Sequence, residues 1–149
     1  MITVFALLVA CGGDTTPPPS APPVAVPATA KQQLPDWDKA VALKAARSAD
    51  GAHLAFKVED GFHVYGAKEQ TSRPLRVEVD GHTDAVATVP DGEPKAVAGV
   101  PDPAYVLKGT IPIDVAVPGA EGGLSGSLHY QVCTNTLCSM PTTRPWTAE

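Results

Sequence analysis

The chain has 149 residues and a formal net charge of −5, and its eleven lysines and arginines are scattered along the sequence. Nucleic acid is therefore not an expected partner, because phosphate backbones select a clustered basic surface. Sixteen prolines and thirteen glycines disfavour long helices and favour many short elements joined by turns. After the amino-terminal appendages are set aside, the remaining length suits one folded domain.

Residues 1–11 are apolar and end in Leu8-Val9-Ala10-Cys11, a sequence that resembles the lipobox of bacterial lipoproteins. In that family the signal peptide is cut before the cysteine, which then carries the lipid. We therefore predict lipidation of Cys11; the alternative is an apolar tail with an incidental cysteine. No lysine or arginine precedes the apolar run. Because secretory signals begin with positive charge, the true start of translation is expected upstream.

Residues 12–33 are rich in proline and small residues and include Pro17-Pro18-Pro19 and Pro22-Pro23. Such runs favour polyproline II, a semi-rigid spacer of ~3 Å per residue. We interpret this segment as a tether that holds the domain away from a membrane. No apolar run reaches the ~18 residues of a membrane span, so the expected membrane contact is the lipid anchor alone. The expected location is the bacterial cell envelope, facing the periplasm.

The folded domain is expected over residues 34–149. Residues 38–49 have a weak pattern that favours one or two helical turns. From residue 52 the period becomes two, and Leu54, Phe56 and Val58 alternate with polar or small residues. This alternation is typical of a half-buried strand.

Further extended segments follow at short intervals. After the turn Asp60-Gly61 we expect extended structure at residues 62–65, a strand at 75–79 and a weaker strand at 84–89. Residues 90–103 are rich in Pro, Gly and Asp, which predicts a long surface loop. A segment at 105–108 is expected to pair with a neighbour.

The clearest alternation covers residues 111–117. Pro112 lies within it on the opposite face, so it should occupy an edge or a bulge. Strands are also expected at 128–132 and 144–147. About seven short strands without a long helix predict an all-β antiparallel sandwich, whose strand order the sequence does not indicate.

Two of the three cysteines, Cys133 and Cys138, flank the short turn Thr134-Asn135-Thr136. These turn residues tolerate tight bends, and a hairpin can bring two Cα atoms to the ~5.5 Å that a disulfide needs. If the strand alternation continues to its end, Cys133 lies on the face of His129, opposite the core.

Three interpretations of this pair remain open. The first is a structural staple, but closing a loop of about six residues stabilises by only ~2 kcal/mol. The second is a redox-active pair, since strained and exposed bridges are the exchangeable ones. The third is half of a zinc site, which would need His63 and His129 nearby. Redox chemistry in an oxidising compartment is the leading hypothesis, and no cofactor is expected.

The segment from Leu128 through Cys133 and Cys138 to Pro141 resembles the carboxy-terminal signature of a known family. That family is the amino-terminal periplasmic domain of DsbD-type thiol:disulfide interchange proteins. Asp60-Gly61-Phe62-His63-Val64-Tyr65 resembles a second family element, a Gly-aromatic-His-x-Tyr strand. The alternating strand 110–117 is a weaker third match. The resemblance covers roughly residues 35–149.

The resemblance implies an immunoglobulin-like β-sandwich whose Cys133/Cys138 pair shuttles electrons. The partners would be a membrane-embedded donor and periplasmic thiol proteins, here separate polypeptides, with this chain a monomer. Cys138 would attack the partner's disulfide. His63 and Tyr65 would lie beside the pair, and an imidazolium at His63 would lower the thiol pKa; the alternative is a solvated strand histidine.

In the family a cap loop with an aromatic residue shields the disulfide. The corresponding residues 99–105 are Pro-rich here, and Tyr105 is their one aromatic residue, so we expect a shortened or absent cap. The expected activity is that of a thiol:disulfide oxidoreductase. The rival function is a non-catalytic envelope adaptor with a structural hairpin disulfide. The sequence contains no nucleophile elbow, phosphate-binding glycine loop or metal-binding acidic loop.

Overall fold

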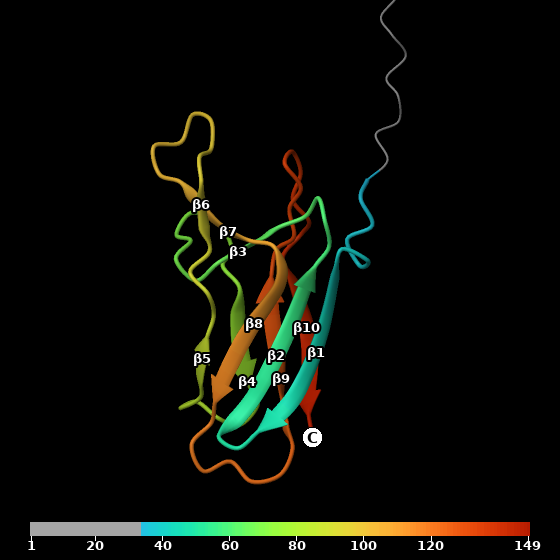
Figure 1. Cartoon of the computed structure of the whole chain (residues 1–149), viewed down its shortest axis with the longest axis vertical. Coiled ribbons are helices and arrows are strands. Elements are labelled where there is room, and N and C mark those ends of the chain that lie inside the picture. The colour runs from blue at the N-terminus through green and yellow to red at the C-terminus, as the bar shows by residue number, and fades with distance from the viewer. Residues whose placement is uncertain (1–33) are drawn as a thin grey trace, which may run out of the picture. The chain divides into compact units, whose positions relative to one another are not determined.

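The computed structural model describes residues 34–149, so the predicted signal, Cys11 lipobox and tether lie outside the described residues. This part of the chain folds into ten strands without a helix (Figure 1). Between residues 34 and 149, therefore, no helix is long and apolar enough to cross a membrane. The strands are β1 (Val41–Ser48), β2 (Gly51–Val58), β3 (Val64–Tyr65), β4 (Arg76–Val79), β5 (Val86–Thr88), β6 (Glu93–Lys95), β7 (Ala104–Leu107), β8 (Gly109–Ala116), β9 (Leu124–Tyr130) and β10 (Thr142–Ala148).

The strands form a sandwich of two antiparallel sheets with a third, small sheet at one end (Figure 1). The first sheet has the order β1-β2-β8-β5 and the second the order β10-β9-β4. The third sheet, β3-β7-β6, carries a hairpin that projects beyond the sandwich. The predicted all-β sandwich is confirmed, with more strands than expected.

The core lies between the two larger sheets and follows the alternation of the sequence. Leu54 and Phe56 of β2 are 2% and 0% exposed, and Ile113 of β8 is 1% exposed. From the opposite sheet, the Tyr130 ring packs 4.9 Å from the Phe56 ring, centroid to centroid. Burying each such side chain stabilises the fold by about 1.5–3 kcal/mol.

The prediction of helical turns at residues 38–49 is wrong, because residues 41–48 form β1. Its residues pair with β2 from Val41↔Val58 to Ser48↔Gly51. Val41 is buried, and Leu43 and Ala45 pack against the core from the same strand face. Alanine has the highest helix propensity, but intrinsic propensity is a weak determinant of structure, and here pairing with β2 and burial override it.

The long loop expected at residues 90–103 is also partly wrong, because residues 93–95 form β6 and pair with β7. Pro94 is tolerated because β6 is the edge strand of its sheet. The second proline of interest, Pro112, lies in β8, which is an interior strand. However, β5 pairs only with residues 114–116, so β8 has a single neighbour at Pro112 and forms a local edge there, as predicted.

Candidate functional site

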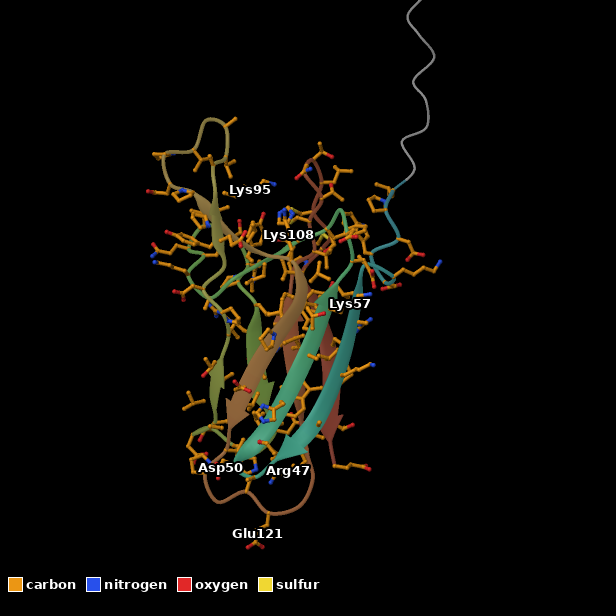
Figure 2. All side chains as sticks on the ribbon, in the orientation of Figure 1. Arg47, Asp50, Lys57, Lys95, Lys108 and Glu121 are labelled. Carbon is orange, nitrogen blue, oxygen red and sulfur yellow. A yellow bond between two sulfur atoms is a disulfide. The ribbon has the colours of Figure 1, made fainter. Side chains whose placement is uncertain are left out.

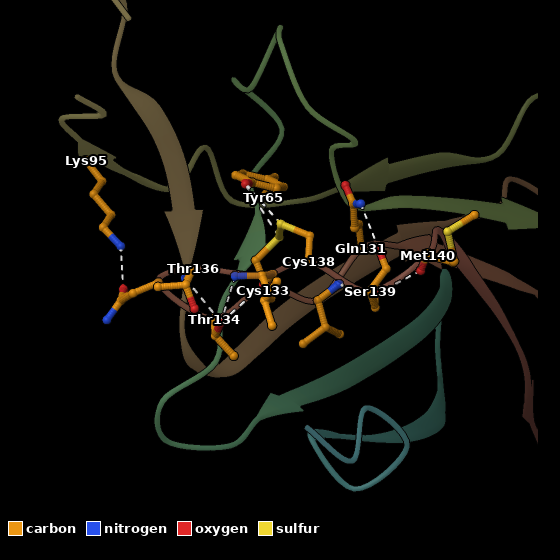
Figure 3. The surroundings of a disulfide bond; sticks show 12 residues. Tyr65, Lys95, Gln131, Cys133, Thr134, Thr136, Cys138, Ser139 and Met140 are labelled. Carbon is orange, nitrogen blue, oxygen red and sulfur yellow. Dashed lines mark hydrogen bonds between the residues drawn. A yellow bond between two sulfur atoms is a disulfide. The ribbon is translucent and has the colours of Figure 1, made fainter. Parts of the chain in front are cut away.

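The cysteine pair forms a disulfide at the end of the sandwich that carries the third sheet (Figure 3). The Cα atoms of Cys133 and Cys138 are 4.0 Å apart. Between them the chain makes a tight turn, in which the Thr134 N–H donates to the Leu137 carbonyl at 2.7 Å. The Leu137 N–H donates in return to Thr134 Oγ1 at 3.0 Å. The turn therefore has hydrogen bonds of its own in addition to the bridge.

The two cysteines differ in exposure: Cys133 is 1% exposed, whereas Cys138 is exposed. The prediction that Cys133 lies on the face of His129 is wrong. Strand β9 ends at Tyr130, and the alternation is lost because Val132 and Cys133 are both buried. Cys133 instead pairs with His63 through two backbone hydrogen bonds of 2.8 and 2.9 Å.

Tyr65 of β3 lies directly against the disulfide. Its hydroxyl oxygen is 3.5 Å from Cys133 Sγ and 3.9 Å from Cys138 Sγ. Neither sulfur of a disulfide carries a proton, so the hydroxyl is the donor in both contacts. The His63 ring meets the Tyr65 ring edge-on, with centroids 5.7 Å apart. Both residues thus lie beside the pair, Tyr65 in side-chain contact and His63 through its backbone.

The side chain of His63 is not a source of positive charge for the pair. His63 is 6% exposed. Burial lowers its pKa, and the nearby ammonium groups of Lys95 and Lys108 lower it further. The imidazole is therefore neutral at neutral pH, which disfavours the imidazolium considered from the sequence.

A residue that sequence reasoning missed reaches the cysteine turn from β6. The Lys95 ammonium donates to Asn135 Oδ1 at 2.8 Å (Figure 3). Because the two residues are 40 positions apart and β6 was expected to be a loop, no local pattern indicated the contact. The aromatic candidate for a cap, Tyr105, is engaged elsewhere: Lys68 Nζ lies 5.3 Å from its ring centroid.

The base of the β6–β7 hairpin is fixed by a second missed residue, the buried carboxylate of Glu69, which is 5% exposed. Its Oε2 accepts the Tyr105 N–H at 2.8 Å, and its Oε1 accepts the N–H groups of Thr71 and Ser72 and the Thr71 hydroxyl. Burial raises the pKa of this carboxyl, but the combined effect of the hydrogen bonds is larger and in the opposite direction. The pKa therefore lies below its ordinary value.

Exposed apolar side chains lie on the turn and on the hairpin at this end of the molecule. Leu137 and Met140 are 39% and 82% exposed, and Val97 and Val100 of the hairpin tip are 42% and 44% exposed. As for the zinc interpretation, residues 34–149 contain no group of three or more His, Cys, Asp or Glu side chains placed to hold a metal ion.

Solved structures that resemble this fold include two amino-terminal domains. One is the Neisseria meningitidis DsbD N-terminal domain in the reduced form, with a TM-score of 0.57 and 21% identity over 78% of this chain and 89% of that chain. The other is the N-terminal periplasmic domain of ScsB from Proteus mirabilis, with a TM-score of 0.51 and 18% identity over 71% of this chain and 44% of that chain. At these identities the likeness shows the fold, an immunoglobulin-like β-sandwich.

No curated protein sequence matches the chain. A family model does match, over residues 31–148, and it describes the amino-terminal part of the thiol:disulfide interchange protein DsbD. Together with the sandwich fold and the cysteine pair at its end, this match assigns the chain: it belongs to the DsbD N-terminal domain family.

Proposed function

We propose that this protein exchanges thiols and disulfides at the bacterial cell envelope through Cys133 and Cys138. The observation that carries the proposal is the asymmetry of the pair. Cys138 is exposed at the end of the sandwich, whereas Cys133 is 1% exposed and lies behind it. An exposed sulfur can reach a partner, and a buried neighbour can then resolve the mixed species.

Starting from the reduced pair, the Cys138 thiolate attacks one sulfur of a partner disulfide. The Cys138–partner bond forms, the partner's S–S bond breaks, and its other sulfur leaves as a thiolate. The Cys133 thiolate then attacks Cys138 Sγ, which forms the intramolecular disulfide and releases the partner's first sulfur. Two electrons have passed to the partner, whose two thiolates accept the equivalent of the two protons that the domain's thiols lost. A donor dithiol restores the reduced pair by the reverse exchange.

Tyr65 supports this chemistry by its position. Its hydroxyl lies within 3.5–3.9 Å of both sulfurs and can donate to whichever sulfur carries negative charge. Hydrogen bonds to an ionised acceptor are roughly twice as strong as neutral ones. The hydroxyl therefore favours the thiolate that attacks or leaves, more than it favours the disulfide.

Protein partners of the thiol-redox class fit the surroundings of the pair. The exposed Leu137 and Met140 flank Cys138 and offer apolar contact area to another protein. We infer that the donor and the clients are separate polypeptides that meet this domain in the periplasm. Lipidation of Cys11 would keep the domain at the membrane where such partners pass.

The rival function, an adaptor with a stapled hairpin, has less support. The turn is already held by the two hydrogen bonds between Thr134 and Leu137. Closing a loop of this length adds only ~2 kcal/mol on the chain-entropy estimate. A bridge retained for stability alone would therefore contribute little at this position.

A trapping experiment separates the two functions. The full chain carrying Cys133→Ser is expressed in cells, quenched with acid, alkylated and run on non-reducing gels. We expect mixed disulfides with partners through Cys138, because the resolving thiol is gone. Cys138→Ser is the matched control and should trap far less, since Cys133 is buried. Absence of adducts from both variants, with a reduction potential well below about −300 mV, would establish the structural staple.

A further inference from the structure

The Lys95–Asn135 hydrogen bond connects the hairpin to the loop that the disulfide closes. Lys95 is half-buried, and its ammonium lies 2.8 Å from Asn135 Oδ1. Asn135 lies between the two cysteines, so a hydrogen bond to its side chain restrains the turn that carries both sulfurs. Figure 3 shows the Lys95 side chain extended toward this turn.

Two lysines act on His63, the backbone partner of Cys133. Lys95 and Lys108 are found at the same end of the sandwich (Figure 2), and both ammonium groups make His63 harder to protonate. His63 forms two hydrogen bonds with the backbone of Cys133, so the residue on which both lysines act is a direct neighbour of the pair. Among residues 34–149, no carboxylate forms a hydrogen bond or ion pair with the turn.

We propose that Lys95 is a positioning residue for the cysteine pair: bonded to Asn135, it holds the turn against the β6–β7 hairpin and stabilises the Cys138 thiolate of the reduced protein. The inference rests on the proposed function and adds the residue that tunes it. A cation stabilises a thiolate and does nothing comparable for a neutral disulfide. Lys95 therefore shifts the equilibrium toward the reduced pair and raises the fraction of attacking thiolate at neutral pH.

The other groups that face the pair do not supply this charge. His63 is neutral, and Tyr65 offers a hydroxyl donor without a net charge. Lys108 also acts on His63, but no side-chain hydrogen bond in the described part of the chain fixes it to the turn. Among the lysines and arginines of residues 34–149, only Lys95 combines the charge with a side-chain hydrogen bond to the loop between the cysteines.

The test compares Lys95→Met with Lys95→Arg, which keeps the charge. Lys44→Met is the matched control, because Lys44 is an exposed lysine on β1. Two quantities are measured on the full-length chain: the pH profile of alkylation of the peptide that carries Cys138, read by mass spectrometry, and the equilibrium constant with glutathione. Thermal unfolding of each variant verifies that it is folded.

For Lys95→Met we expect the alkylation profile to move to higher pH and the glutathione equilibrium to move toward the disulfide. The change should be about threefold to tenfold, or about 15–30 mV. Lys95→Arg should retain most of the wild-type behaviour, and Asn135→Ala should move both readouts in the direction of Lys95→Met by a smaller factor. Lys44→Met should match the wild type.

Two results would overturn the inference. One is a Lys95→Met protein with the profile and potential of Lys44→Met. The other is an equal loss in Lys95→Met and Lys95→Arg, which would exclude the charge as the cause. Both readouts use small reagents without a protein partner, so they stand even when the trapping experiment finds no adducts, and trapping can succeed when Lys95 proves inert.

Discussion

The two ends of the sandwich are held by different chemistry. At one end the Arg47 guanidinium donates to the carbonyl oxygens of Ala120 and Gly122 and to those of Ser48 and Gly51, which ties the β1–β2 turn to the β8–β9 loop (Figure 2). At the other end the cysteine turn has its own hydrogen bonds, one hydrogen bond from Lys95, and the Cys133–Cys138 disulfide. We therefore expect substitutions at the Arg47 end to change stability without changing the chemistry of the cysteine pair.

The largest expected effect on stability comes from the core between the two ends. Phe56→Ala removes a fully buried ring that packs on Tyr130. The lost burial and the resulting cavity should lower the free energy of unfolding by about 3–5 kcal/mol. Urea denaturation measures the change.

The same variant tests the separation of stability from reactivity. Because Phe56 lies in the core, alkylation of Cys138 in the folded fraction should keep its wild-type pH profile. A shifted profile at temperatures where the variant is folded would show that core packing controls the cysteine turn.

Glu69→Gln is expected to lower the free energy of unfolding by less than Phe56→Ala does, but it tests the residue that fixes the base of the β6–β7 hairpin. The amide N–H₂ group replaces one of the two accepting oxygens. In one orientation the Tyr105 N–H loses its acceptor, and in the other the N–H groups of Thr71 and Ser72 lose theirs. We expect a loss of about 2–3 kcal/mol at neutral pH. Since Glu69 fixes β7, Cys138 reactivity should change as well, in the direction of Lys95→Met.

The pH dependence of this variant has a definite sign. The pKa of Glu69 is lower in the folded protein than its ordinary value of 4.5, so the carboxylate stabilises the fold above that pH. The contribution is lost as the pH falls below 4.5 through the folded-state pKa. The stability difference between wild type and Glu69→Gln should therefore shrink in acid; a constant difference would contradict the assignment.

The fold could be predicted where burial follows the period of the sequence. The alternation at Leu54, Phe56 and Val58 and at residues 111–117 gave strands β2 and β8 and the sandwich class. The errors arose where tertiary pairing decides the structure. Strand β1 contains alanines, which favour helix, so its composition hides the strand. Strand β6 is three residues long with a proline at its centre, so its composition predicts a loop.

The site was predictable in its local parts and not in its distant ones. Cys133 and Cys138 are close in sequence, and the strand motif at 60–65 indicated Tyr65. Lys95 belongs to the β6–β7 hairpin, which the sequence did not predict, and its partner Asn135 is 40 positions away. Glu69 binds Tyr105 of the same hairpin across 36 positions. Even the burial of Cys133 depends on where β9 ends, which alternation alone cannot fix.

At the opposite end of the sandwich, Arg47→Met should reduce stability without changing the thiol chemistry. The variant leaves carbonyl oxygens of Ala120 and Gly122 without their charged donor. Since the site is only half-buried, water replaces part of the loss, and we expect about 1–2 kcal/mol by urea denaturation. Arg76→Met, at an exposed arginine of β4, is the control and should have little effect. A change in Cys138 alkylation on replacing Arg47 would break the proposed separation of the two ends.

The smallest change in stability at high pH is expected from His63→Gln. The same variant tests which cation acts on the cysteine pair. The pKa of His63 is lowered from 6.5 by burial and then by Lys95 and Lys108, so the folded protein favours the neutral ring. Its contribution to stability is present above 6.5 and is lost as the pH falls below that value, where the unfolded chain binds the proton first. His63→Gln should therefore remove this loss below 6.5 and, at about pH 8, cost less than about 1 kcal/mol.

The alkylation profile of Cys138 in His63→Gln provides the decisive comparison. A neutral ring contributes no charge to the thiolate, so the profile should stay close to wild type while that of Lys95→Met moves. If replacing His63 moves the profile as far as replacing Lys95 does, an imidazolium acts on the pair after all. In that case His63 keeps its proton although the ammonium groups of Lys95 and Lys108 oppose it. The positive charge that acts on the pair would then come from both His63 and the hairpin.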